Sequence, residues 1–188
     1  MKELPIIPFT SPVAMEQWLE EHHATKDGIW LKMAKKHSGI PSITYDEALD
    51  IALCFGWIDG QRKSYDSNFF IQKFTPRRPR SLWSSRNVKK VAALTAAGRM
   101  RPAGLAQVTA AKQDGRWERA YGNHEEMPIP ADFLAALEAN PTARTTFDSL
   151  KKVDRYQIAF RLTTAIKPET RQRRFAKILD MLEKGSFR

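Results

Sequence analysis

Apolar and polar residues alternate along short stretches of the first half of the chain, and this pattern predicts a small sheet. Residues 29–34 (IWLKMA) alternate with the period of a strand. Residues 58–65 and 68–75 lie on either side of Asp66-Ser67, which predicts a β-hairpin around that turn. In its second arm, alternate residues fall on opposite faces, with Phe70, Gln72 and Phe74 together on one of them.

Residues 4–9 (LPIIPF) are apolar but contain two prolines, which cannot donate to a strand ladder. We therefore expect an edge strand or an extended arm there. Ser11 and Pro12 are typical of the start of a helix. Thr44 and Glu47 have the spacing of a capping box, which predicts a second helix. Two more helices are expected at about residues 86–97 and 102–113.

The second half of the chain has the apolar spacing of helices throughout. One is expected at residues 131–138, one capped by Thr142, one capped by Asp154, and one beginning at Pro168. The fold class predicted is α+β: a small, mostly antiparallel sheet with packed helices, followed by an all-helical C-terminal segment. We place the α+β domain at residues 1–115, a linker at 116–130 and the helical segment at 131–188.

Composition limits the class of protein. Hydrophobic residues make up 42% and charged residues 28% of the 188 residues, as in globular proteins. No apolar run approaches the roughly 20 residues that cross a bilayer. The single cysteine, Cys54, excludes an internal disulfide framework and any CxxC motif. We expect a cytoplasmic protein, with no cofactor and no metal ion.

The net charge of +10 is concentrated in one segment. Residues 60–101 contain eleven Lys and Arg residues against one acid, Asp66, so the segment carries 11 − 1 = +10. The remainder has 31 − 11 = 20 basic and 21 − 1 = 20 acidic residues and is balanced. A local basic patch attracts anions, nucleic acid or acidic lipid surfaces. The alternative is a solvated face that serves only solubility.

The strongest candidate for a binding site lies between Pro76 and the start of the helix near residue 86. Guanidinium groups bind phosphate or carboxylate by two parallel hydrogen bonds, and hydroxyl, amide and N–H groups at a helix start add further donors. The predicted ligand-binding residues of this segment are Arg77, Arg78, Arg80, Ser84, Ser85 and Asn87.

Four other residues near this segment are candidates for the same site. Trp57 and Trp83 have two interpretations, as stacking platforms beside the arginines or as core residues. Asp59 could orient an arginine or act as a general base, or it could have a structural role in which it pairs with Arg62 or caps a turn. The sequence lacks the GxxxxGK[ST], GxGxxG, HExxH and GxSxG motifs, so no catalytic residue is assigned.

Two stretches of the sequence resemble a known family. CFGWIDG with FTPRRPRSLWSSRN, and TAIKPETRQRRFAKILDMLEKG, are similar to the bacterial YdeI/OmpD-associated family, also called bacteriocin-protection. Glu169-Thr170-Arg171 and the following arginines fit the family's C-terminal core, but Ile166 separates Ala165 from Lys167, where the family has an alanine-lysine pair. The resemblance spans roughly residues 29–185 and implies a cytoplasmic bacterial protein associated with stress or envelope protection. It implies no reaction.

The leading hypothesis is therefore a non-enzymatic protein that binds an anionic small molecule or a phosphate-bearing ligand through the basic-aromatic segment. The first alternative is a nucleic-acid-binding protein. The second is an enzyme of unknown reaction that uses Asp59.

Overall fold

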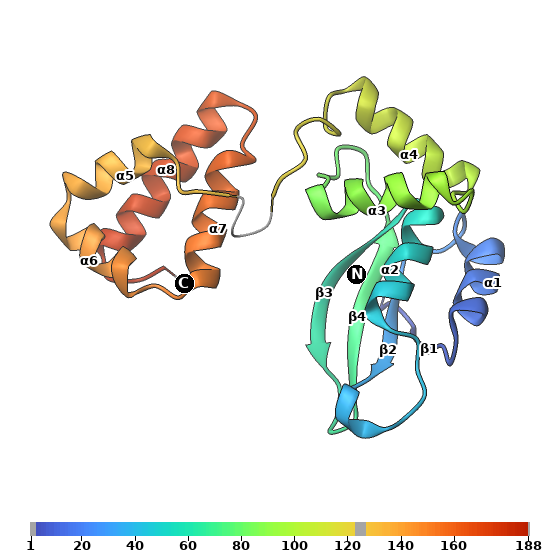
Figure 1. Cartoon of the computed structure of the whole chain (residues 1–188). Helices are drawn as coiled ribbons and strands as arrows, with labels where there is room; N and C mark the ends of the chain where they lie inside the picture. Colours follow the sequence, from blue (N-terminus) through green and yellow to red (C-terminus); the bar gives the residue numbers. More distant parts are fainter. Residues whose placement is uncertain (1–2, 123–126, 188) are drawn as a thin grey trace. The chain divides into compact units, whose positions relative to one another are not determined.

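The computed structural model describes residues 3–122 and 127–187 (Figure 1). The chain forms two compact units, an N-terminal unit of residues 1–120 and a C-terminal unit of residues 121–188. Part of the predicted linker, residues 123–126, lies outside the described residues. Within the described ranges, no helix is both long and apolar enough to span a membrane.

The N-terminal unit is built on a four-stranded sheet. Its strands are β1 (Ile6–Pro8), β2 (Ile29–Ala34), β3 (Trp57–Ser64) and β4 (Phe69–Pro76), in the order β1-β2-β4-β3. Only β1 pairs in parallel, with β2, whereas the β2–β4 and β3–β4 pairs are antiparallel. The predicted α+β class, the hairpin and the edge position of the proline-containing strand are confirmed.

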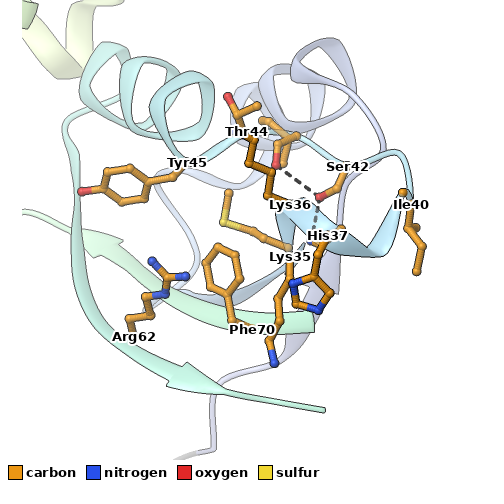
Figure 2. A pocket seen from close by; sticks show the side chains of 13 residues that line it. Lys35, Lys36, His37, Ile40, Ser42, Thr44, Tyr45, Arg62 and Phe70 are labelled. Atoms are coloured by element: carbon orange, nitrogen blue, oxygen red, sulfur yellow. Dashed lines mark hydrogen bonds between the residues drawn. The ribbon is translucent and has the colours of Figure 1, made fainter. Parts of the chain in front are cut away.

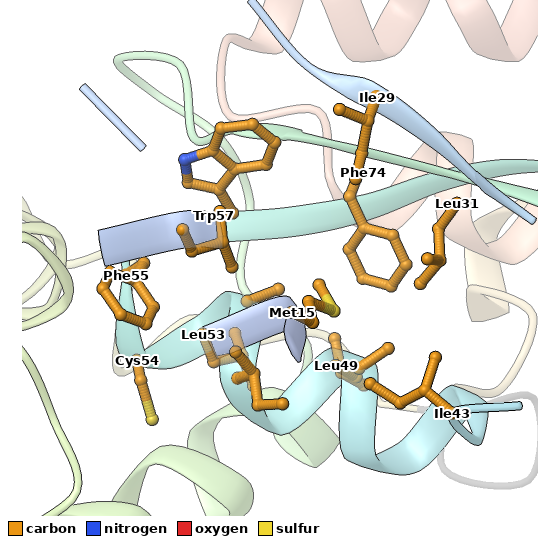
Figure 3. Packing of buried hydrophobic residues seen from close by; sticks show 14 of the residues in the cluster. Met15, Ile29, Leu31, Ile43, Leu49, Leu53, Cys54, Phe55, Trp57 and Phe74 are labelled. Carbon is orange, nitrogen blue, oxygen red and sulfur yellow. The ribbon is translucent and has the colours of Figure 1, made fainter. Parts of the chain in front are cut away.

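The two faces of the sheet have different environments. Ile29, Leu31 and Met33 of β2 point toward the helices and are buried, as are Phe70 and Phe74 of β4. We call this the inner face. Figure 3 shows Leu31 and Phe74 directed at Met15 and Leu49, which come from the helices that cover this face. The residues of β2 and β4 that alternate with these inward-facing residues form the outer face.

A β-bulge in β3 sets which residues of that strand face inward. Asp59 pairs with Phe74, and Arg62 pairs with Gln72. Asp59 and Arg62 are three positions apart in β3, whereas their partners in β4 are only two positions apart, so β3 contains one extra residue here. The extra residue keeps both Asp59 and Arg62 on the inner face. Buried Gln72 stabilises the bulge, because its Nε2 donates to the carbonyls of Gly60 at 2.8 Å and Gln61 at 3.3 Å.

Four α-helices complete this unit: α1 (Pro12–His22), α2 (Tyr45–Cys54), α3 (Ser85–Ala96) and α4 (Pro102–Gln113), with a short 3-10 helix at Lys36–Ser38. The Ser11 cap and the Thr44–Glu47 capping box form as predicted. Helix α4 packs closely on the end of α2, where Gly104 lies against the carbonyl of Cys54 with no room for a Cβ atom. Burial raises the pKa of the Cys54 thiol to about 11.

The C-terminal unit contains α5 (Ala131–Glu138), α6 (Pro141–Ser149), α7 (Lys152–Thr163) and α8 (Pro168–Glu183) around a separate core that includes Phe133, Ile158 and Leu182. Two predicted caps are wrong. Asn140, not Thr142, caps α6, because its Oδ1 accepts from Ala143 N at 3.1 Å and Pro141 occupies the first helical position. Helix α7 already begins at Lys152, which places Asp154 inside its first turn.

Arginines of α8 bind the neighbouring helices. Arg171 forms an ion pair with Asp132 of α5 at 2.7 Å, and Arg174 Nη1 donates to the Arg161 carbonyl of α7 at 2.8 Å. The hydrogen bond from Arg171 holds the pKa of Asp132 below its ordinary value of 3.8. These arginines therefore hold α8 in place, beyond forming a solvated face.

Replacing Gln72 by leucine tests the support of the bulge. In this variant the carbonyls of Gly60 and Gln61 lose their hydrogen-bond donor, but both residues are exposed, so water can replace it. We therefore expect the free energy of unfolding to fall by about 1–2 kcal/mol. All five tryptophans lie within residues 1–120, so tryptophan fluorescence during urea denaturation reports on this unit alone. Gln61→Ala is the control, with an expected change within about 0.5 kcal/mol. An unchanged Gln72→Leu midpoint would contradict the assignment.

Replacing Arg171 by methionine tests the contact between α8 and α5. Both partners are partly exposed, at 34% and 52%, so we expect a loss of only about 0.2–1 kcal/mol at neutral pH. Because the pair depresses the pKa of Asp132, its contribution is complete above the ordinary pKa of 3.8 and disappears as the pH falls through the lower folded value. Hydrogen exchange of α5 and α8 peptides at neutral and acidic pH measures this. A difference between variant and wild type that persists in acid would count against the ion pair.

Candidate functional site

A pocket of about 720 Å³ opens on the inner face of the sheet, beside the start of α2. Its walls come from the end of β2, the segment that joins β2 to α2, and the β3–β4 hairpin (Figure 2). Met33 and Phe70 reach it because they are inner-face residues near the ends of their strands. The pocket therefore depends on the same alternation that forms the core.

Arg62 lies at the edge of the pocket over an aromatic ring. Its guanidinium carbon is 3.8 Å from the ring centroid of Phe70, so the planar group stacks on the ring. The side chain is exposed, and no carboxylate in the described parts of the chain lies within ion-pair distance of it. Its hydrogen-bonding groups are available to a ligand.

Tyr45 lines the side of the pocket opposite His37 and Ile40 (Figure 2). Its hydroxyl donates to Asp59 Oδ2 at 2.8 Å, which joins the first turn of α2 to β3. Burial, followed by the nearby Asp59 carboxylate, raises the pKa of Tyr45 well above its ordinary value. Tyr45 is therefore neutral, and Asp59 serves as its acceptor.

The segment between β2 and α2 is fixed to the hairpin by hydrogen bonds. Lys35 Nζ donates to the Asp66 carbonyl at 2.7 Å, and His37 Nε2 donates to the Ser67 carbonyl at 3.3 Å. Ser42 Oγ accepts from Ala34 N at 3.2 Å on the other side of the segment. The wall is thus held at both of its ends.

The pocket is electropositive. Its lining includes Lys35, Lys36, Arg62 and His37, and none of its thirteen lining residues is acidic. The N-terminus of α2 is already capped by its own side chain, because Glu47 Oε2 accepts from Thr44 N at 2.8 Å. The positive charge of the lining therefore comes from its side chains.

The residues predicted from the sequence do not come together in one place. Arg62 lines the pocket and Asp59 supports it through Tyr45. Trp57 is buried in the core, where its Nε1 donates to the His23 carbonyl at 3.1 Å. The remaining candidates lie before or at the start of α3.

The three predicted arginines before α3 do not form one cluster. Arg77 is only 5% exposed, its guanidinium lies 3.5 Å from the ring centroid of buried Trp83, and its Nη1 donates to the Leu82 carbonyl at 3.1 Å. Arg78 and Arg80 are exposed in the turn that follows, where Arg80 adopts a positive φ of 70°. Only these two face solvent.

The polar candidates at the start of α3 contribute to the structure of the helix. Ser84 Oγ accepts from Asn87 N at 3.2 Å and caps α3, Asn87 is buried, and Ser85 is half-buried. Two basic residues of α3 pair with α2, since Arg86 binds Asp46 at 2.6 Å and Lys90 binds Asp50 at 2.6 Å. A ligand-binding role for the predicted set stays a prediction.

The sequence interpretation missed most of the pocket. The sequence analysis assigns no binding role to Lys35, Lys36, His37 or Tyr45, all of which line the pocket. The available signal was the pair of lysines followed by the His37-Ser38-Gly39 turn, immediately before a capped helix. Among the described residues, no group of three His, Cys, Asp or Glu side chains could hold a metal ion.

Comparison with known proteins assigns the two parts of the chain to two families. Residues 126–185 match the model of the family described as Bacteriocin-protection, YdeI or OmpD-Associated, which confirms the resemblance over this part of the chain. Residues 7–107, which include GWIDG and PRRPRSLWS, match instead a family described as a Domain of unknown function (DUF8412). No curated protein and no solved structure matches the chain. The match at residues 7–107 covers more than half of the chain, so the chain belongs to the DUF8412 family. It also carries a YdeI/OmpD-associated segment at residues 126–185.

Proposed function

We propose that the N-terminal unit is a non-enzymatic binding module that takes an anionic small molecule into the pocket beside α2. The observation that carries the proposal is a pocket lined by three Lys and Arg side chains and one histidine, with no acidic residue among its lining. Its volume of about 720 Å³ lies in the range of about 300–1,000 Å³ that is usual for small-molecule sites.

The shape of the site favours a flat ligand with an acidic group. Met33, Phe70 and the ring of Tyr45 supply apolar surface, and Arg62 supplies the planar guanidinium that pairs with a carboxylate or phosphate by two hydrogen bonds. Stacking on Phe70 restricts the orientation of Arg62, so less conformational freedom is lost when a ligand binds. An aromatic carboxylate or the phosphate monoester of an aromatic alcohol satisfies both parts of the site.

The family of the C-terminal segment gives this binding a context. Its description names bacteriocin protection. We propose that this chain contributes to protection of the same kind in the cytoplasm, with the N-terminal unit recognising the ligand.

A ligand screen tests the site. We expect aromatic carboxylates or phosphate monoesters to raise the melting temperature, because a ligand at about 100 times its Kd stabilises the folded state by about 2.7 kcal/mol. Arg62→Gln removes a charged donor and should weaken binding by about 10- to 100-fold in calorimetric titration. The Arg78→Gln/Arg80→Gln variant, which alters the exposed arginines before α3, is the control and should bind like wild type. Loss of binding in that variant alone would move the site to the 77–87 segment. If both variants bind as wild type, neither site binds the ligand.

A further inference from the structure

The outer face of the sheet carries aromatic and basic side chains in adjacent positions. None of its residues belongs to the buried cluster between the sheet and the helices, although Ile71 is itself only 8% exposed. The face is made of Trp30 and Lys32 of β2, Phe69, Ile71 and Lys73 of β4, Lys63 of β3, and Tyr65 just beyond β3. Tyr65 is 48% exposed, and Ile6 of β1, beside Trp30, is 44% exposed. Tyr65 is exposed and Trp30 and Phe69 are half-buried, so part of each ring is in contact with solvent.

Strand pairing places each lysine beside an apolar neighbour. Trp30 lies opposite Lys73, and Ile71 lies between Lys32 on one side and Lys63 on the other. Lys32 Nζ is 4.5 Å from the ring centroid of Tyr65 and 4.2 Å from that of Phe69. The ammonium groups of Lys63 and Lys73 are 4.8 and 5.9 Å from the Trp30 ring.

The charge on this face has one sign. All four strands lie within the described residues, and no outward position of any strand is acidic. The one strand carboxylate, Asp59, faces inward to Tyr45. In contrast to Arg86 and Lys90, which pair with carboxylates of α2, the three lysines contact only aromatic rings among the interactions described.

We propose that this outer face binds single-stranded nucleic acid. Bases stack on exposed aromatic rings whatever their sequence, and lysines beside the rings reach the phosphates between successive bases. A lysine–ring contact at an exposed site is weaker than base stacking, so an incoming base can displace the ammonium group, which then binds phosphate. Intact duplex keeps its bases stacked internally and cannot use the rings.

Charge complementarity disfavours a second copy of this chain as the occupant. The same face of a second copy would place lysines opposite lysines, which is unfavourable. An acidic lipid surface would also attract the lysines, and binding to anionic vesicles distinguishes it from nucleic acid. The proposed site is independent of the pocket, which lies on the inner face.

Fluorescence anisotropy with a labelled 15-nucleotide oligo(dT) and oligo(rU) tests the proposal on the full chain. The variant Lys32→Gln/Lys63→Gln/Lys73→Gln should weaken binding and reduce the slope of log K against log salt by about 2, at about 0.7 per phosphate contact on single strands. A charge-matched control, Lys26→Gln/Lys89→Gln/Arg99→Gln, removes three exposed cations elsewhere and should have a much smaller effect.

Two ring variants separate stacking from charge. Trp30→Leu and Tyr65→Ser should each weaken binding by about 5- to 150-fold while leaving the salt slope unchanged. Tyr65 is exposed, so its variant remains informative if Trp30→Leu is poorly folded. A urea midpoint for each variant confirms folding.

Several outcomes would overturn the proposal. Equal losses in the two triple variants would indicate that net charge alone attracts the strand. Duplex DNA bound as tightly as oligo(dT) would exclude stacking. Anionic phosphatidylserine vesicles that bind with the same sensitivity to Trp30→Leu, or sedimentation that shows self-association lost in that variant, would assign the face to a lipid surface or to a second copy.

Discussion

Side chains along a strand alternate between two faces, and the N-terminal unit depends on that alternation being interrupted at one place. In β2 and β4 the period is regular, so Ile29, Leu31 and Phe74 fill the core while the residues between them meet solvent. In β3 the bulge after Asp59 inserts one residue and so brings Arg62 to the core side of the sheet. A strand without this insertion would turn Arg62 outward and Lys63 inward. The pocket would then lack Arg62, and the outer face would lack Lys63.

The position of each basic side chain on the surface is set by the strand or helix that carries it. The segment 60–101 carries the whole net charge of the protein, yet its residues are divided among the pocket, the outer face and the contacts between helices. Arg101 binds Glu16 and Glu20 of α1 at 3.2 and 3.3 Å, so acids distant in sequence neutralise part of the segment. Clustering of charge in a sequence therefore does not establish clustering on a surface. Of the other cations in the segment, only Arg62, Lys63 and Lys73 lie on strands of the sheet.

Local signals in the sequence predict much of the fold. Ser11-Pro12, Thr44 with Glu47, and Pro168 begin helices because capping and the geometry of proline act within a few residues. The hairpin follows from the two stretches, 58–65 and 68–75, that flank the Asp66-Ser67 turn. Thr142 was a wrong cap because Asn140, two residues earlier, also has a side-chain acceptor and is followed by a proline.

The candidate site was predicted less well because it is built from contacts between distant residues. Lys35 and His37 bind carbonyls of the hairpin turn about 30 positions away, and no local pattern records such a contact. Arg77 resembles its exposed neighbours in the sequence, but in the structure it is stacked on buried Trp83. The bulge is equally hidden, since Gly60-Gln61 fits an uninterrupted strand until its pairing with Gln72 is known. Arg62 was selected as the partner of Asp59, whereas its structural neighbour is Phe70.

The burial of the lone thiol has a practical consequence. Cys54 is 2% exposed and covered by α4, and its raised pKa leaves almost no thiolate at neutral pH. The natural chain therefore behaves toward maleimide dyes as if it contained no cysteine. A single sulfhydryl engineered into the hairpin or the helical unit will be labelled selectively, which allows spectroscopic probes to be attached one at a time without first removing a native residue.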